Sequence, residues 1–303
     1  MHIRRLHRPL ATIGLALAAT LALGACGGGV DASPAGGKID VVASTNVYGN
    51  IAEAIGGDLV QVHSIITKAS ADPHAYEATA QDKLAVSKAT VGIENGGGYD
   101  DFFGQLANGV LDPAKVVNVS DLSALNTGPG FNEHLWYSLP TLAKLSEELA
   151  ARFSAADPSG KATFAANATT FKAGLGKLEA RLATVKKADG GAGVAITEPV
   201  PLYLLQAAGL VNKTPSAFSD AIENGSDVPA MTLLETIALV DSGAVKLLAY
   251  NDQAESAQTQ QLRDAAVAAG VPVVNFAETL PANMTYLQWM DANISQVEQA
   301  LGK

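Results

Sequence analysis

The sequence predicts an α/β fold with two lobes, each with a small parallel sheet flanked by helices, joined by one long rigid linker helix. The first observation is that short Val- and Ile-rich runs alternate with stretches of helical period from Ile39 onward, which is typical of βαβ units. The second is that this alternation occurs twice, before and after a helical stretch that follows Asp157. The third is that 303 residues, with 48% hydrophobic and 17% charged residues, suit one or two packed domains.

Eight strands are predicted, four in each lobe. In the first lobe they are expected at residues 39–43, 60–66, 91–94 and 116–119. In the second lobe they are expected at residues 193–197, 210–213, 245–250 and 271–276, of which 210–213 has the weakest pattern. Because helical stretches separate the strands, both sheets are predicted to be parallel.

A single long helix is predicted between the lobes. Asp157 is a suitable N-cap for it and Pro158 a suitable first helical residue. Gly174 and Gly176 weaken the prediction, because each costs about 1 kcal/mol relative to alanine inside a helix. Apolar residues nevertheless recur at helical spacing, at Phe164, Phe171, Leu175, Leu178, Leu182 and Val185. The predicted organisation is a signal peptide (1–25), a tether (26–38), an N-terminal lobe (39–156), the linker helix (157–188) and a C-terminal lobe (189–303).

The first residues have the features of an export signal. Residues 1–9 carry three arginines and no acid, and residues 10–23 are almost entirely apolar. This apolar run is shorter than the roughly 20 residues that a membrane-spanning helix needs. No later run is as long, so no membrane-spanning segment is predicted in the mature protein.

The single cysteine of the chain follows this apolar run. Cys26 comes directly after Leu23, Gly24 and Ala25, and this arrangement resembles a bacterial lipobox. The resemblance implies that Cys26 is lipid-modified and becomes the first mature residue, which accounts for an unpaired cysteine in an exported protein. An ordinary signal peptide with a chance cysteine is the alternative. The glycine-rich residues after Cys26 are then a flexible tether.

Charge and motifs exclude several classes of function. The net charge of −10 and the pI near 4.9 argue against nucleic acid as a partner. The sequence has no His-Glu-x-x-His, no Gly-x-Ser-x-Gly and no cysteine pair. Three glycines at residues 96–98 lack the Lys-Ser/Thr that follows in a phosphate-binding loop, so they are interpreted as a turn.

Histidines are the first candidates for function. Two of the five precede the predicted cleavage site, which leaves His63, His74 and His134. His74 follows the second predicted strand behind a proline, and His134 lies where a loop leads into a helix. Neutral imidazole is a common metal ligand, and stiff loops hold ligands well, so His74 and His134 are candidates for one metal site. On spacing alone, two loop histidines 60 residues apart are more often unrelated, and His63 is expected on a strand face.

Four segments resemble the zinc/manganese class of substrate-binding proteins of ABC importers. They are Asp-Pro-His-Ala-Tyr-Glu at 72–77, Asn-Glu-His-Leu-Trp at 132–136, the stretch 201–210, and Tyr-Leu-Gln-Trp-Met at 286–290. The resemblance extends over essentially the whole chain after the tether. It implies two α/β lobes joined by one rigid helix, with a single divalent cation in the cleft between them. It also implies that His74 and His134 are the ligands from the first lobe.

The same resemblance implies two ligands from the second lobe. Glu198 stands after the first strand of that lobe, where the family has His or Glu, and Glu278 stands after the last strand. Asp252 is the competitor of Glu278. The alternatives are that Glu198 caps a helix and that Glu278 is a solvated loop acid. Two neutral imidazoles and two carboxylates would neutralise a divalent cation, and closure of the carboxylates onto it would drive lobe closure.

The expected function is therefore a high-affinity extracytoplasmic receptor, lipid-anchored to the cell membrane. It would capture Zn²⁺ or Mn²⁺ as transported ligand and deliver it to an ABC permease driven by an ATPase, as a monomer and without catalysis. The alternative is a secreted metallohydrolase that uses the same residues. Such an enzyme would need an open coordination position and an unligated general base, and the sequence offers no identifiable base.

The sequence leaves the metal open between Zn²⁺ and Mn²⁺. Glutamate oxygens suit the harder Mn²⁺, whereas the general affinity order favours Zn²⁺. The absence of a His-rich loop points towards manganese or a zinc receptor of lower affinity. Affinity is expected to fall below about pH 6.5, as His74 and His134 become protonated.

Overall fold

The computed structural model describes residues 37–68, 73, 74, 76–126, 128 and 130–302, which all belong to the unit Gly36–Lys303. The predicted signal peptide, Cys26 and most of the tether lie outside the described residues. Asp72 and Ala75, the neighbours of the Pro73-His74 pair, also lie outside them. No helix among the described residues has both the length and the apolar composition needed to cross a bilayer.

The first sheet contains four parallel strands in the order β2-β1-β3-β4. They are β1 (Ile39–Thr45), β2 (Val60–Ile66), β3 (Val91–Glu94) and β4 (Val116–Asn118). The accompanying helices are α1 (Asn46–Gly56), α2 (Ala80–Lys88), α3 (Asp101–Ala107) and α4 (Val119–Ser123). In register, Val41 of β1 stands opposite Val62 of β2 and Val91 of β3. The predicted parallel sheet of the first lobe is confirmed, with β2 and β3 at the predicted positions.

The second sheet repeats this topology, with the order β6-β5-β7-β8. Its strands, all parallel, are β5 (Gly193–Ile196), β6 (Val211–Asn212), β7 (Leu248–Asn251) and β8 (Val273–Phe276). Its helices are α7 (Leu202–Ala207), α8 (Ser216–Glu223), α9 (Ala230–Asp241), α10 (Ala257–Ala268) and α11 (Tyr286–Ala300).

Strand β7 starts later than predicted, at Leu248 and not at residue 245. Backbone pairing with β5 nevertheless begins earlier. The N–H of Lys246 donates to the carbonyl of Gly193 (2.8 Å), and the N–H of Ala195 donates to the carbonyl of Leu247 (3.0 Å). Residues 246 and 247 thus pair with β5, although the regular geometry of strand β7 begins only at Leu248.

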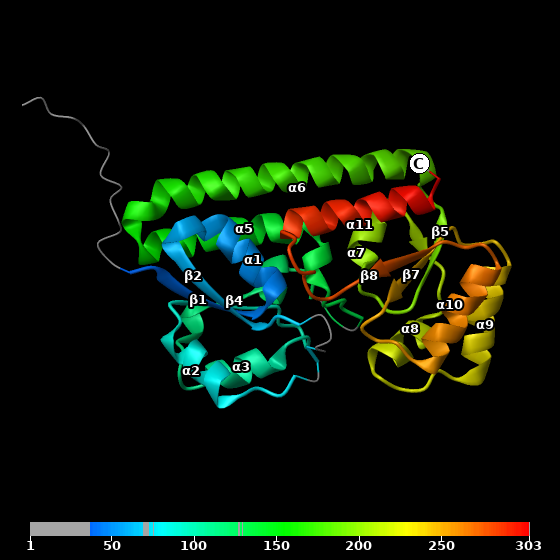
Figure 1. Cartoon of the computed structure of the whole chain (residues 1–303), viewed down its shortest axis with the longest axis horizontal. Coiled ribbons are helices and arrows are strands. Elements are labelled where there is room, and N and C mark those ends of the chain that lie inside the picture. The colour runs from blue at the N-terminus through cyan, green and yellow to red at the C-terminus, as the bar shows by residue number, and fades with distance from the viewer. Residues whose placement is uncertain (1–36, 69–72, 75, 127, 129, 303) are drawn as a thin grey trace, which may run out of the picture. The chain divides into compact units, whose positions relative to one another are not determined.

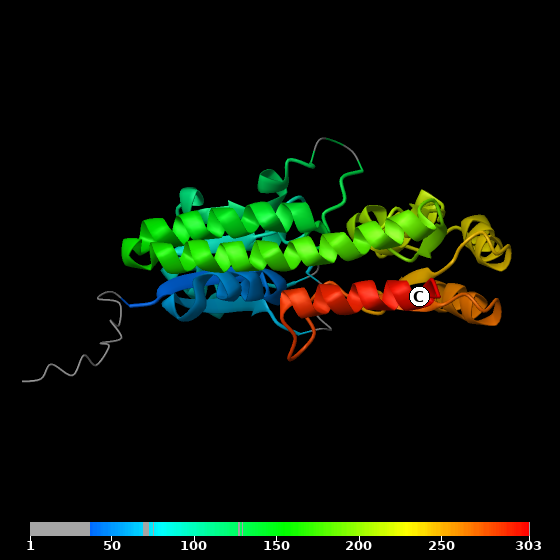
Figure 2. The same cartoon turned by 90° about the horizontal axis from the view of Figure 1, so that it is seen from above.

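One long helix, α6 (Lys161–Asp189), extends along both lobes, and it is visible in green in Figures 1 and 2. It packs on α1 and α5 (Leu139–Ala156) in the first lobe and on α7 and α11 in the second. Its buried face contains all six predicted apolar residues together with Ala168. The helix starts later than predicted because Asp157 caps a short 3₁₀ turn at Pro158–Gly160, where its Oδ1 accepts from the N–H of Ser159 (3.0 Å).

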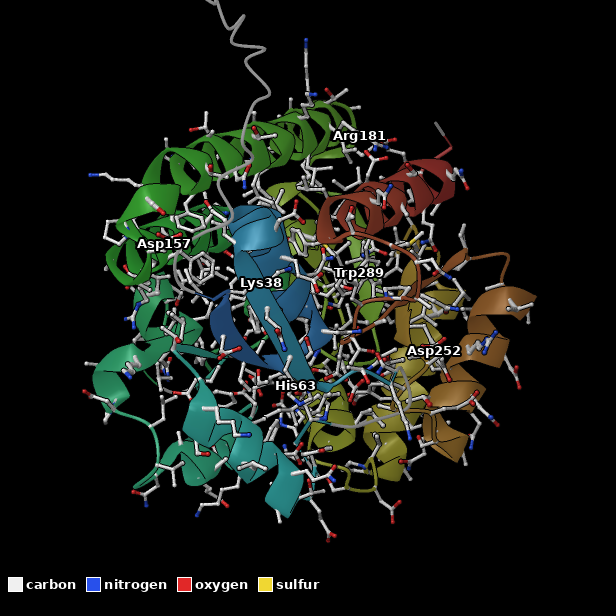
Figure 3. The ribbon with its side chains drawn as sticks, turned by 60° about the vertical axis from the view of Figure 1, so that its left-hand side comes forward. Lys38, His63, Asp157, Arg181, Asp252 and Trp289 are labelled. Atoms are coloured by element: carbon white, nitrogen blue, oxygen red, sulfur yellow. The ribbon has the colours of Figure 1, made fainter. Side chains whose placement is uncertain are left out.

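Close packing against α11 explains one glycine of the long helix. A Cβ atom at Gly174 would lie 2.5 Å from Cδ1 of Leu287, so any larger residue here would require the Leu287 side chain to move. Arg181 of α6 adds ion pairs with Asp291 and Glu298 of α11, and Figure 3 shows it beside that helix. These contacts attach the linker helix to the second lobe.

The largest core cluster contains buried side chains from both sheets and from α6. Aromatic residues near the lobe junction belong to it. The hydroxyl of Tyr286 donates to the carbonyl of Trp136 (2.7 Å), and that of Tyr137 donates to the carbonyl of Ala277 (2.9 Å). Trp136 and Trp289 are both buried in this cluster.

Candidate metal centre

Two histidines and one glutamate bring potential metal-binding atoms together. Oε1 of Glu223 lies 3.6 Å from Nε2 of His74 and 3.6 Å from Nε2 of His134. One donor atom from each of the three residues lies within 4.8 Å of the other two. Imidazole nitrogens and carboxylate oxygens are ligands for divalent first-row metals. These three residues therefore form the core of a candidate metal centre.

Asn132 holds His134 in one orientation. Oδ1 of Asn132 accepts from the backbone N–H of His134 (3.1 Å) and lies 2.7 Å from its Nδ1. Because this oxygen can only accept, Nδ1 carries the proton and Nε2 keeps its lone pair. Nδ2 of Asn132 donates to the carbonyl of Pro199 in the second lobe (3.0 Å). Asn132 thus aims the His134 lone pair at the cluster and ties its loop to the residue that follows Glu198.

His74 lies in the connection between β2 and α2. Its ring packs edge-on against Tyr99, with the ring centroids 5.0 Å apart. In the chain that follows His74, the hydroxyl of Tyr76 donates to Oδ2 of Asp82 (3.1 Å). Asp82 also forms a capping box with Thr79 at the start of α2. These contacts fix the segment that follows His74. The side chain of His74 itself is 31% exposed.

Asn251 brings the two predicted second-lobe carboxylates together. Its Nδ2 donates to Oε2 of Glu198 (2.7 Å) and to Oε1 of Glu278 (2.9 Å). Glu198 and Glu278 are only 6% and 8% exposed. Two buried carboxylates next to one amide form an environment that favours a cation, because like charges at close range repel each other.

A cavity of about 590 Å³ lies beside His74, Glu223 and the two carboxylates held by Asn251, whereas His134 is not among its described lining residues. Glu198 and Glu278 do not belong to the cluster of donor atoms within 4.8 Å of one another, which contains His74, His134 and Glu223. The described lining of the cavity includes His74 and five carboxylates, and it contains no lysine or arginine; the carboxylates are those of Glu198, Glu223, Asp227, Glu255 and Glu278. Tyr99 lies close to both His74 of the first lobe and Glu278 of the second. Its ring contacts that of His74. Burial, and then the charge of Glu278, raise the pKa of Tyr99 well above the usual value. A cavity lined by negative charge concentrates cations.

The position of the cavity follows from the topology of the sheets. His74 follows β2, Glu198 follows β5, Asn251 is the last residue of β7, and Glu278 follows β8. All four therefore lie at or after the carboxyl ends of parallel strands, where open α/β sheets bind ligands. His134 comes from the loop before α5, in a segment anchored by Asn95 after β3, whose Nδ2 donates to the carbonyl of Glu133 (2.9 Å).

Burial strongly affects the protonation of His134. Burial, and then the proximity of His74, lower the pKa of His134 from 6.5 to about 3. The expectation that His134 becomes protonated below about pH 6.5 is therefore wrong for the folded, metal-free protein. The imidazole keeps a lone pair for a metal over the whole neutral and mildly acidic range.

The free energy of unfolding of the metal-free protein is expected to fall as the pH falls from about 6.5 towards 3. In this range the unfolded chain binds a proton at His134 and the folded protein does not, so acid favours unfolding by up to about 1.4 kcal/mol per pH unit. Urea unfolding at several pH values measures this slope. The variant His134→Asn lacks the titrating group and should show a correspondingly flatter slope; an unchanged slope would contradict the prediction.

The structure separates the remaining candidates. Asp252, the competitor of Glu278, is exposed and does not line the cavity, and Figure 3 shows it beside α10. His63 lies on β2 with an exposed side chain, outside the cluster. Sequence reasoning missed Glu223 and Asn251. No sequence motif indicates Glu223. Asn251 could have been predicted, because it is a polar residue at the end of an apolar strand and directly precedes Asp252.

Comparison with protein families gives a match over most of the chain. The family described as "ZnuA: Zinc-uptake complex component A periplasmic" matches residues 41–300. The match includes both sheets, the linker helix and every residue of the candidate site.

Individual relatives are named for manganese or zinc. The manganese ABC transporter substrate-binding lipoprotein PsaA of Streptococcus mitis is 27% identical over 57% of this chain and 59% of its own length. The manganese-binding lipoprotein MntA of Bacillus subtilis is 30% identical over 54% of this chain and 55% of its own length. The alignments thus span somewhat more than half of each relative. The periplasmic zinc-binding protein TroA from Treponema pallidum has the same fold, with a TM-score of 0.72 over 88% of this chain and 99% of its own, at 20% identity.

Proposed function

The chain belongs to the family of the periplasmic zinc-uptake complex component A, and on that premise we propose that it is an extracytoplasmic receptor for one divalent transition metal. The transported ligand is Zn²⁺ or Mn²⁺, which the protein binds between its lobes and delivers to the permease of an ABC importer. The protein performs no chemical reaction. The names of its relatives, two for manganese and one for zinc, support this proposal.

The convergence of donor atoms carries the proposal. Nε2 of His74, Nε2 of His134 and a carboxylate oxygen of Glu223 lie within 4.8 Å of one another. Two further buried carboxylates line the same cavity as His74. A set of protein donors this rich can surround a cation without a vacant position for an activated water, which suits a receptor better than a hydrolase.

In this proposal His74, His134, Glu198 and Glu278 bind the cation. The two imidazoles are neutral ligands, and the two carboxylates balance the charge of a divalent ion, which limits the cost of burying it. The hydrogen bonds of Asn251 support the assignment, because they keep both carboxylates at one place at the cavity wall. The exposed position of Asp252 favours Glu278 as the ligand.

Direct contacts between the lobes lie next to these ligands. Asn132 donates to the carbonyl of Pro199, directly after Glu198. Asn46 of α1 exchanges two hydrogen bonds with the backbone of Leu280, two residues after Glu278 (2.8 and 2.9 Å). A cation that binds histidines of one lobe and carboxylates of the other therefore stabilises the same arrangement as these contacts. This differential affinity is what ligand-driven closure requires.

Further parts of the proposal concern location and partners. The protein is attached to the membrane by a lipid on Cys26 and acts as a monomer. Its partners are a membrane permease and the ATPase that drives it, and its acidic charge argues against nucleic acid. The word lipoprotein in the names of two relatives supports the anchor.

Metal analysis tests the proposal directly. We expect protein purified from its own cell surface to contain about one divalent transition metal ion per chain. We also expect metal-free protein to bind Zn²⁺ and Mn²⁺ in mutually exclusive titrations. Isothermal titration calorimetry with competition between the two ions then identifies the preferred cargo. Absence of stoichiometric binding of either ion would contradict the proposed function.

A further inference from the structure

Glu223 occupies a position that the predicted ligand set does not use. It is the last residue of α8, and its side chain is only 16% exposed. One of its carboxylate oxygens is equidistant from the two histidines, at 3.6 Å from each Nε2. No other acidic residue of the described chain shares this relation to both histidines.

The chemistry of the His134–Glu223 pair points to a cation. Since Nδ1 of His134 donates to Asn132, its Nε2 presents a lone pair towards the carboxylate oxygen of Glu223. Neither atom is a donor in this arrangement, so the two cannot form a hydrogen bond with each other. A positive ion between them would turn this contact between two acceptors into an attraction.

The distances agree with this reading. Neighbouring ligand atoms held at about 2.0–2.2 Å from one metal ion lie about 2.8–3.6 Å from each other in octahedral or tetrahedral geometry. The separation of 3.6 Å between Glu223 and each histidine is at the upper end of that range. A single ion can therefore contact all three residues after small side-chain movements.

The end of α8 is an electrostatically unfavourable place for a carboxylate. A negative charge at the carboxyl end of a helix is unfavourable by about 0.3–1 kcal/mol, because the helix dipole is negative there. Asp220 and Asp227, which lie close in sequence, add charge of the same sign. A bound cation would offset both effects.

We infer that Glu223 is a ligand of the transported cation, so that α8 contributes a third carboxylate to the site; this inference rests on the proposed function. The full set then contains two imidazoles and three carboxylates. This set is rich in oxygen donors and carries one negative charge more than a divalent ion neutralises. Such a set favours the harder Mn²⁺ relative to a site with two imidazoles and two carboxylates, which is well suited to tetrahedral Zn²⁺.

The variant Glu223→Gln tests the inference by competition titration of metal-free protein with Mn²⁺ and Zn²⁺. We expect the Kd for Mn²⁺ to rise on the order of 10- to 100-fold and the Kd for Zn²⁺ to rise less, because four suitable zinc ligands remain. Asp241→Asn is the matched control. It removes the same charge from the last residue of another helix, α9, where the side chain is exposed and does not line the cavity, and we expect it to change neither affinity appreciably.

The visible spectrum of bound Co²⁺ gives a second readout, since its intensity depends on the coordination number. We expect a changed spectrum for Glu223→Gln and an unchanged one for Asp241→Asn. If Glu223→Gln does not fold, Glu223→Asp is used, which keeps the charge on a shorter side chain; weaker Mn²⁺ binding with an altered spectrum supports the inference.

Wild-type affinity together with a wild-type Co²⁺ spectrum in the variant used would overturn the role of Glu223. That result would leave the receptor proposal intact, because the wild-type protein would still bind the metal ion. Failure of the wild-type protein to bind any of the three ions would instead refute the proposed function, and the inference with it.

Discussion

Replacing His74 with alanine is expected to abolish stoichiometric metal binding, with a loss of affinity of more than about 100-fold. His74 supplies one of the two nitrogen donors of the cluster, and Nε2 of His134 alone cannot replace it. The side chain is 31% exposed, so its removal should have little effect on folding. His134 is a poorer probe, because it is 1% exposed and its removal would leave a space in the core.

The measurement is titration of metal-free protein with Zn²⁺ and with Mn²⁺. His63→Ala is the matched control, because it removes an exposed imidazole from β2, outside the cluster. The control should bind like the unmodified protein. If His74→Ala bound either ion with full affinity, His74 would be removed from the site.

Much of the fold could be predicted because its signals are local. Alternating apolar runs identified the strands, and the buried face of α6 contains every residue that the helical spacing indicated. The start of that helix could not be predicted from Asp157 and Pro158. The same cap-and-proline pattern suits a 3₁₀ turn equally well, and the chain forms such a turn before the α-helix begins. Likewise, the packing reason for Gly174 lies in Leu287, more than a hundred residues away.

The site was predictable only where a residue lies in a recognisable segment. His74 and His134 stand in segments with distinctive neighbours, and the structure brings them together at Glu223. Glu223 lies at the end of α8, directly after the buried Ile222, and its sequence neighbours give no indication of a ligand. Its relation to the histidines arises only from the way the two lobes pack. The role of Asn251 is hidden for the same reason, since its two partners are 53 and 27 residues away.

Replacing Asn251 with leucine is expected to lower the free energy of unfolding of the metal-free protein by several kcal/mol. Leucine has a similar size but removes the amide that donates to both Glu198 and Glu278. Each buried carboxylate then loses a hydrogen bond, at a cost of about 1–3 kcal/mol or more for a charged group. A cation at the candidate site would supply positive charge in place of the amide, so saturating metal should recover part of the loss.

Urea unfolding with and without saturating Mn²⁺ or Zn²⁺ measures both effects. Asn293→Leu is the control, because Asn293 is equally buried, at 2% exposed, but lies on α11 next to Tyr137. Its loss of stability should be the same with and without metal. An equal loss in both conditions for Asn251→Leu would mean that the cation does not act on Glu198 and Glu278. The binding site would then be confined to His74, His134 and Glu223, because only these donors would remain close to the ion.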